Sequence, residues 1–112
     1  MFQSLTNLVL TGAKPKGKRS HLWPMVRAAH LERQPVCQAC GAKKRLEVHH
    51  ILPFHMAPDR ELEPSNLLTL CEGLAVNCHF LYGHLRNWKA WNPMVKLDAA
   101  IWREKMDRRQ TS

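Results

Sequence analysis

Four cysteines in two pairs constrain the fold of this chain more than any other sequence feature. Cys37 and Cys40 lie in the segment PVCQACG, and Cys71 and Cys78 lie in TLCEGLAVNC. A Cys-x-x-Cys pair followed by a glycine (here Gly41) is typical of a turn that brings two thiolates onto one tetrahedral zinc ion. The second pair has six intervening residues, more than the usual two to four. We expect all four thiolates to bind one structural zinc ion.

Disulfides, free thiols and a redox site are the alternatives to zinc. The first residues, MFQSLTNLVL, form a short segment without a basic region, so we do not interpret them as a secretory signal. We therefore expect a cytoplasmic protein, in which thiols stay reduced and a disulfide framework is disfavoured. A redox-active Cys-x-x-Cys pair would need a thioredoxin-like βαβ context, which the sequence lacks.

The charge balance indicates a polyanionic partner. The chain has 112 residues, with 17 Lys and Arg against nine Asp and Glu, which gives a net charge of +8. Such an excess attracts nucleic acid through Coulomb forces and counterion release, although an unspecialised basic surface has the same composition. No apolar run approaches the roughly 20 residues that span a bilayer, so no membrane partner is expected. The length fits one small domain with a modest core.

Two regions are expected before the first cysteine. Residues 1–19 include most of the Gly-, Pro- and Lys-rich segment TGAKPKGKRS and are predicted to be a flexible basic arm. Residues 20–112 are predicted to be the folded domain. Ser20 would cap a helix over about 21–33 that Pro35 ends. Trp23, Val26 and His30 would share one face of this helix.

A strand over about 45–51 is predicted after the cysteine knuckle. Prolines in PFHMAPDRELEP argue against regular structure there, so a long loop should follow. The apolar segment NLLTLC is either a helical turn or a short strand. A helix should begin around Cys78 and run towards Trp88, with its far end made uncertain by Gly83.

The last predicted element is an amphipathic helix. Asn92 would be its N-cap and Pro93 its first residue. Four residues recur at helical spacing and should pack on the domain: Val95, Ala99, Trp102 and Met106. The other faces carry basic residues that would grip phosphates: Lys96, Arg103, Lys105, Arg108 and Arg109.

The segment LEVHHILPFH places two histidines side by side at the end of the predicted strand. Adjacent strand residues point to opposite faces, so His49 and His50 cannot do the same work on a regular strand. One buried structural histidine and one exposed histidine would be the simplest explanation. A bulge, or the end of the strand, would instead let both rings reach one site.

The order of these motifs resembles that of the HNH endonucleases, of the ββα-metal nuclease class, and in particular the small HNH proteins of tailed phages. The matching segments are LEVHHILP, NLLTLC and NCHFLYGH, bracketed by the cysteine pairs, with WPMVRAAHLERQPVCQACG and NWKAWNP fitting the phage subgroup. The resemblance extends over about residues 20–107. It implies an α+β fold: a small zinc-stabilised ββα-metal domain with flanking N- and C-terminal helices.

The resemblance also implies roles for individual residues. His50 would be the general base, and His49 and His79 would bind a catalytic divalent ion such as Mg²⁺, Mn²⁺ or Ni²⁺. Asn66 would tie the loop to the strand and so orient the base, although a turn asparagine also fits its context. Independently of the family, phosphodiester hydrolysis needs a base near neutral pH, for which imidazole is suited, and a cation.

The roles of several other side chains remain open. His84 follows His79 by five residues, which on a regular helix leaves the two about 140° apart. A shared ion therefore requires a bulge or a break, for which Gly83 is the obvious place. We expect His84 to be a further ligand of the catalytic ion, and the alternative is a structural or DNA-contacting residue. His55 should lie near the site, within reach of phosphate, and His21 should be at the surface. Trp88, like Trp91, is expected in the core rather than as a stacking platform.

Two functions follow from these expectations. The first is a metal-dependent endonuclease that cuts double-stranded DNA. The second is a zinc-stabilised DNA-binding module without activity, which would have no need for the set His49, His50, Asn66 and His79. The phage resemblance further implies a role beside a terminase in genome packaging, in the host cytoplasm.

Overall fold

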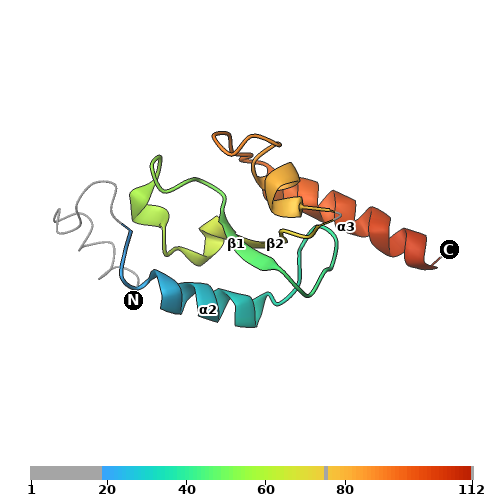
Figure 1. The fold of residues 1–112 in the computed structure, drawn as a ribbon, viewed down its shortest axis with the longest axis horizontal. Coiled ribbons are helices and arrows are strands. Elements are labelled where there is room, and N and C mark those ends of the chain that lie inside the picture. Colours follow the sequence, from blue (N-terminus) through green and yellow to red (C-terminus); the bar gives the residue numbers. More distant parts are fainter. Residues whose placement is uncertain (1–18, 75, 112) are drawn as a thin grey trace.

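The computed structural model describes residues 19–74 and 76–111, and the predicted basic arm lies outside them except for Arg19. A two-stranded sheet with helices around it gives a small α+β fold, as predicted (Figure 1). Helix α2 lies along one side of the strands, and the helical turn η3 packs against the same sheet. Helix α3 packs on η3 and extends away from the sheet towards the C-terminus.

Helix α2 covers Trp23–Arg33 and is tied to the sheet through the residue that follows it. The N-cap is Leu22, so the prediction that Ser20 caps a helix from residue 21 was wrong by two positions. Ser20 Oγ instead accepts a hydrogen bond from the Leu22 amide at 3.1 Å, in the turn that precedes the helix. After the helix, the Gln34 side chain accepts from the Thr69 amide at 2.7 Å, and the Gln34 carbonyl accepts from the Thr69 hydroxyl at 2.8 Å.

Strands β1 (Leu46–His50) and β2 (Leu67–Cys71) pair antiparallel, which decides in favour of a strand for NLLTLC. Their register is regular, from Leu46 opposite Cys71 to His50 opposite Leu67. All five residues of β2 are buried, and this explains why the segment is continuously apolar rather than alternating. The strand predicted for about 45–51 is therefore confirmed.

The loop between the strands contains two short 3₁₀ turns, η1 (Pro58–Arg60) and η2 (Pro64–Asn66). Each begins with a proline, whose missing amide hydrogen is not needed at the first position of a turn. The prediction that prolines exclude all regular structure from this loop was therefore wrong for these two turns.

The helix predicted from Cys78 to Trp88 is a single π turn, η3, over His79–Gly83. It ends at Gly83, so the predicted extension towards Trp88 was wrong. Helix α3 then covers Val95–Thr111. Asn92 does cap its start, since Asn92 Oδ1 accepts from the Met94 amide at 2.9 Å. The regular helix begins at Val95, two residues after the expected residue, Pro93.

The hydrophobic core is small and contains cysteine thiols. Cys37, Cys71 and Cys78 are at most 1% exposed and cluster with Leu70. From α3, Val95 and Ala99 are buried in the same core and Trp102 packs against it, as their spacing predicted. The core and the cysteine cluster are thus one structure.

Candidate functional site

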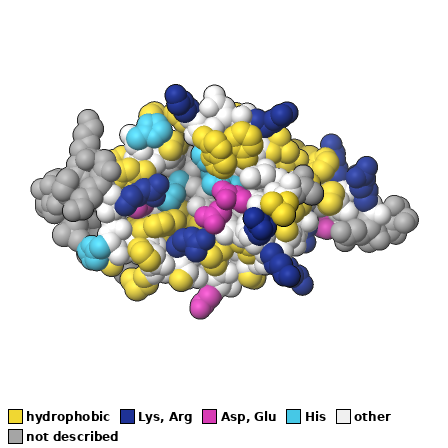
Figure 2. All heavy atoms as spheres, in the orientation of Figure 1, with side chains coloured by type: hydrophobic (Ala, Val, Ile, Leu, Met, Phe, Trp, Pro, Cys, Tyr) yellow, Lys and Arg dark blue, Asp and Glu magenta, His cyan; other side chains and the backbone are white. Residues whose placement is uncertain are grey.

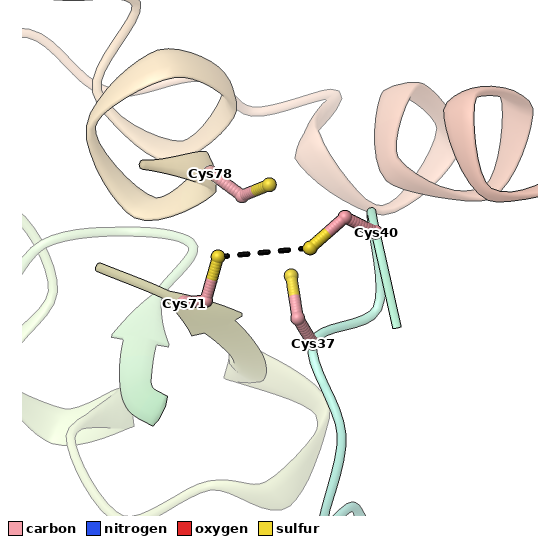
Figure 3. A group of neighbouring side chains, drawn as sticks. All are labelled: Cys37, Cys40, Cys71 and Cys78. Atoms are coloured by element: carbon pink, nitrogen blue, oxygen red, sulfur yellow. Dashed lines mark hydrogen bonds between the residues drawn. The ribbon is translucent and has the colours of Figure 1, made fainter. Parts of the chain in front are cut away.

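The four cysteines converge into one cluster (Figure 3). Cys37 and Cys40 come from the knuckle, Cys71 from the end of β2 and Cys78 from the residue before η3. Their sulfurs all lie within 4.8 Å of one another, and none of the four forms a disulfide. The wide second pair closes because Cys71 donates a hydrogen bond to the Val76 carbonyl at 3.4 Å, which folds the intervening residues back. Four convergent thiols are the donor set of a structural zinc site, so the cluster is positioned to bind a metal and is compatible with zinc.

The knuckle needs its glycine. Gly41 has a φ of +82°, a conformation that residues with a side chain rarely adopt. A Cβ there would lie 3.2 Å from the guanidinium carbon of Arg103, whose Nη1 donates to the Cys37 carbonyl at 3.4 Å. Helix α3 therefore closes over the back of the knuckle through Arg103.

The thiols have strongly perturbed acidities. A hydrogen bond from the Cys78 thiol lowers the pKa of Cys37 to about 4, and the same bond raises the pKa of Cys78. Loss of solvation raises the pKa of Cys40 to about 11. A buried cluster favours one thiolate and resists further negative charge, because unpaired charge is costly away from water. A bound cation would remove that resistance, which is the behaviour expected of metal ligands.

Three histidines form a second cluster, the histidine trio: His49, His79 and His84. His49 comes from β1, while His79 opens η3 and His84 follows it. One ring nitrogen from each lies within 4.8 Å of the others, and the ring centroids are 4.8–5.1 Å apart. The trio has the residue types and the convergence to hold a divalent ion.

The π turn explains how histidines five residues apart can meet. The His84 amide donates to the His79 carbonyl at 3.2 Å, which is the i→i+5 bond of a π turn. On an α-helix the two side chains would diverge, whereas here their rings are neighbours. Of the two expected devices, a bulge or a break, the structure has a π-type bulge that ends at Gly83. Gly83 serves a different need, because a Cβ there would lie 2.9 Å from the His49 ring.

Hydrogen bonds fix the tautomers of two members of the trio. His79 Nδ1 lies 2.8 Å from Glu72 Oε2, and His84 Nδ1 lies 2.8 Å from the Ala90 carbonyl. A carboxylate and a carbonyl only accept, so each neutral ring donates from Nδ1 and carries its lone pair on Nε2. A histidine whose other nitrogen donates to a carboxylate or carbonyl is the usual arrangement around a protein-bound metal.

His49 is the buried member of the trio. It is 1% exposed, and its Nε2 has no hydrogen-bond partner, although buried ring nitrogens almost always have one. Burial, with the neighbouring His79 and His84, lowers the pKa of His49 to about 3, and burial also lowers the pKa of His84. His49 is therefore neutral at physiological pH and able to donate a lone pair. A bound cation would satisfy the orphaned nitrogen, so the trio passes this test of fit.

His50 lies on the other face of β1. Its ring centroid is 4.5 Å from that of Trp23, and its Nε2 donates to the Glu61 carbonyl at 2.9 Å. The neutral ring then carries its lone pair on Nδ1. Because β1 pairs in a regular register, a bulge was the wrong alternative for bringing both adjacent histidines to one site. His50 is the last residue of β1, so the end of the strand is the alternative that remains.

Asn66 is buried and uses its side chain to hold the long loop. Its Oδ1 accepts from the Leu52 amide at 2.8 Å, and its Nδ2 donates to the Leu52 and Arg60 carbonyls at 3.1 and 3.2 Å. These bonds tie the end of β1 to the residue before Glu61, whose carbonyl holds His50. The predicted link between loop and strand is therefore present in the geometry.

Two acidic residues near these histidines were missed in the sequence. Glu72 directly follows Cys71 and orients His79, and no pattern in the sequence marks it. Glu61 is 1% exposed, accepts from the Ser20 amide at 3.0 Å and pairs with Arg19 at 3.5 Å. A glutamate in a proline-rich loop is expected to be exposed to solvent, and only the tertiary structure shows that Glu61 is buried.

The remaining predictions have mixed outcomes. His30 is buried and His21 is exposed, as expected. His55 is exposed and contacts the Trp91 ring, 5.6 Å between centroids, and it does not belong to the trio. The prediction that Trp88 belongs to the core was wrong, because its side chain is 54% exposed.

Residues 37–83 match the model of the HNH endonuclease family. The matched segment begins at the first cysteine of the cluster and ends with the π turn, so it includes β1, β2, Asn66 and His79. This segment therefore matches the HNH endonuclease family, as the sequence motifs predicted. No curated protein and no solved structure was found to match the chain. Among the described residues, no helix is long and apolar enough to cross a membrane.

Proposed function

We propose that this protein is a divalent-metal-dependent endonuclease that hydrolyses phosphodiester bonds of DNA. The observation that carries the proposal is the histidine trio, with two fixed tautomers and one orphaned nitrogen. Two of its members, His49 and His79, lie in the segment that matches the HNH family, and His84 directly follows that segment. Three imidazoles have no structural need to converge, because they desolvate one another without forming mutual hydrogen bonds. A DNA-binding module would gain nothing from them.

His49, His79 and His84 would hold the catalytic ion. A donor set of three imidazoles suits Ni²⁺ and other transition metals better than Mg²⁺, which prefers oxygen ligands. The bound ion would supply a positive charge to neutralise the charge that develops on the scissile phosphate. The cysteine cluster would hold a separate zinc ion and stabilise the small core.

His50 would act as the general base through Nδ1. The Glu61 carbonyl holds the ring in the tautomer that leaves this atom unprotonated, and Trp23 packs against the ring. Asn66 would act indirectly, by fixing the loop that carries that carbonyl. A base held in one tautomer can accept a proton from water without first reorienting.

Double-stranded DNA is the proposed partner, and the net charge of +8 supports a polyanion. We retain 1–19 as a basic arm and 20–112 as the nuclease domain in this proposal. The association with a phage terminase, and the host cytoplasm as its place, stay predictions from the sequence resemblance.

Relaxation of supercoiled plasmid tests the proposed activity. Wild type should nick or cut with Ni²⁺, Mn²⁺ or Mg²⁺ and not with EDTA. His50→Ala should lower the rate at least about 100-fold, the low end of what a general base contributes. The matched control is His55→Ala, an exposed histidine outside the trio, which should stay active. Absence of cleavage by wild type with all three metals, at full zinc content, would favour the binding module.

A further inference from the structure

Trp88 is the only exposed aromatic side chain in the part of the chain that the structure describes. Its ring centroid lies 5.3 Å from that of His79, 4.8 Å from that of His84 and 4.7 Å from that of Phe80. It therefore packs beside two members of the histidine trio while more than half of its surface remains open. A tryptophan left open at the edge of a site is costly in water, unless a partner covers it.

The loop that carries Trp88 is strained and firmly held. Leu85 and Arg86 have φ values of 54° and 64°, a conformation that residues with a side chain rarely adopt. Hydrogen bonds fix the turn: the Arg86 amide donates to the Phe80 carbonyl at 2.9 Å, and the Ala90 amide donates to the Asn87 carbonyl at 2.8 Å. Strain that the surrounding structure maintains is concentrated at functional sites. The loop presents Trp88 in a defined position.

The residues that flank Trp88 in its loop are basic, and Glu72, which is bonded to His79, is an acidic residue on the side of the trio. Arg86 and Lys89 flank it in the loop, and both side chains are exposed. The sequence has no acidic residue between Glu72 and Asp98. Figure 2 shows histidine side chains on one face of the molecule beside hydrophobic and acidic side chains, with lysines and arginines spread around them. An open aromatic ring among basic side chains is the pattern of proteins that bind unpaired nucleic acid strands.

We propose that Trp88 stacks on an unpaired nucleobase of DNA, next to the phosphate that the histidine trio engages. This inference rests on the proposed nuclease function and narrows its substrate to DNA with a gap, a flap or a single-stranded stretch. In a continuous duplex both faces of every base are covered by neighbouring bases, so no face is free for an indole. Arg86 and Lys89 would bind the phosphates on either side of the stacked nucleotide.

Binding to two DNA duplexes of the same sequence tests this inference, one continuous and one with a central gap. Fluorescence anisotropy without added divalent ion measures affinity independently of catalysis. Trp88→Ala should weaken binding to the gapped DNA by about 5- to 150-fold, the range measured for one base–aromatic stack, and should change binding to the continuous duplex much less. The matched control is Leu97→Ala, which removes a side chain of similar exposure (52%) from α3 and should leave both affinities unchanged.

Two further variants separate stacking from simple apolar contact. Trp88→Phe keeps an aromatic face and should retain most of the preference for gapped DNA, whereas Trp88→Leu should lose it. If Trp88→Ala does not fold, as judged by zinc content and thermal unfolding, the comparison of Trp88→Phe with Trp88→Leu tests the inference alone. Wild-type affinity in Trp88→Leu, or equal losses on both DNAs in Trp88→Ala, would overturn the inference.

The inference and the proposed function fail in different ways. A preference for gapped DNA that depends on Trp88, in a protein that cuts no DNA with any metal, would keep the stacking site and remove the nuclease. Metal-dependent cleavage with affinities that do not depend on Trp88 would keep the nuclease and remove the stacking site.

Discussion

The cysteine cluster and the histidine trio adjoin each other at two places in the chain, yet they differ in burial and in number of donors. Cys71 is followed directly by Glu72, and Cys78 is followed directly by His79, so the two clusters are linked at both places. The cysteines offer four donors within the core, and three of them are at most 1% exposed. The trio offers three donors, and His79 and His84 are only partly buried.

That difference distinguishes a structural metal site from a catalytic metal site. Four protein ligands close a tetrahedral site, whereas three leave positions for water or substrate. The trio also lies beside an exposed aromatic loop, while the cysteines contact core residues and the back of α3. Cys78 and His79 are adjacent in the sequence, yet the first belongs to the cysteine cluster and the second to the histidine trio. Neighbouring side chains can join different clusters because they point to different sides of the chain.

The largest expected effect is loss of the fold on removal of a cysteine. Cys71→Ser should lower zinc content and unfold the domain, because the thiols are part of the small core and metal binding contributes to folding free energy. Zinc analysis and circular dichroism measure this. Leu74→Ser, at an exposed position between the two cysteines of the second pair, is the control and should fold normally. A zinc-free Cys71→Ser as heat-stable as wild type would contradict the structural role.

Removing a histidine should instead spare the fold and abolish activity. His79→Ala leaves His49 and His84, and two imidazoles hold a divalent ion much more weakly than three. We expect no plasmid cleavage, no Ni²⁺ binding at the trio by calorimetry, and unchanged zinc content and thermal stability. Loss of zinc from this variant would contradict the separate roles of the two clusters, because they would then be one cooperative site.

Sequence patterns predict the donors of both clusters better than they predict how the trio is assembled. The cysteine pairs and the adjacent histidines are local signals, and β1 follows from a short alternating run. The π turn does not follow from a sequence pattern. Its hydrogen bonds span five residues instead of four, and a five-residue segment is too short to show that difference in its sequence. Likewise, the exposure of Trp88 and the burial of Glu61 depend on contacts with distant residues, so composition indicated the opposite for both.

A smaller effect is expected from the residue that joins the two clusters. Glu72→Gln keeps an acceptor for His79 Nδ1 but removes the negative charge, and we expect Ni²⁺ affinity at the trio to fall about 10- to 100-fold. Glu47→Gln is the matched control, because that side chain is 43% exposed against 39% for Glu72 and pairs with Arg27 instead. Calorimetry on zinc-loaded protein measures both. Equal affinities in the two variants would show that Glu72 does not support His79.

The smallest effect concerns the pH dependence of stability. An unfolded histidine has a pKa of about 6.5, whereas burial holds the pKa of folded His49 to about 3. Between these values the unfolded chain binds the additional proton, so the free energy of unfolding falls as the pH drops below about 6.5. His49→Asn removes the titrating group and should make this decline shallower. Urea unfolding from about pH 7.5 to about pH 5.5, without added divalent ion and with zinc content measured at each pH, separates this effect from acid release of zinc. Identical declines in wild type and variant, at equal zinc content, would mean that His49 is protonated as readily in the folded protein as in the unfolded chain. The trio would then lack the neutral, buried donor on which its difference from an ordinary surface cluster of histidines depends.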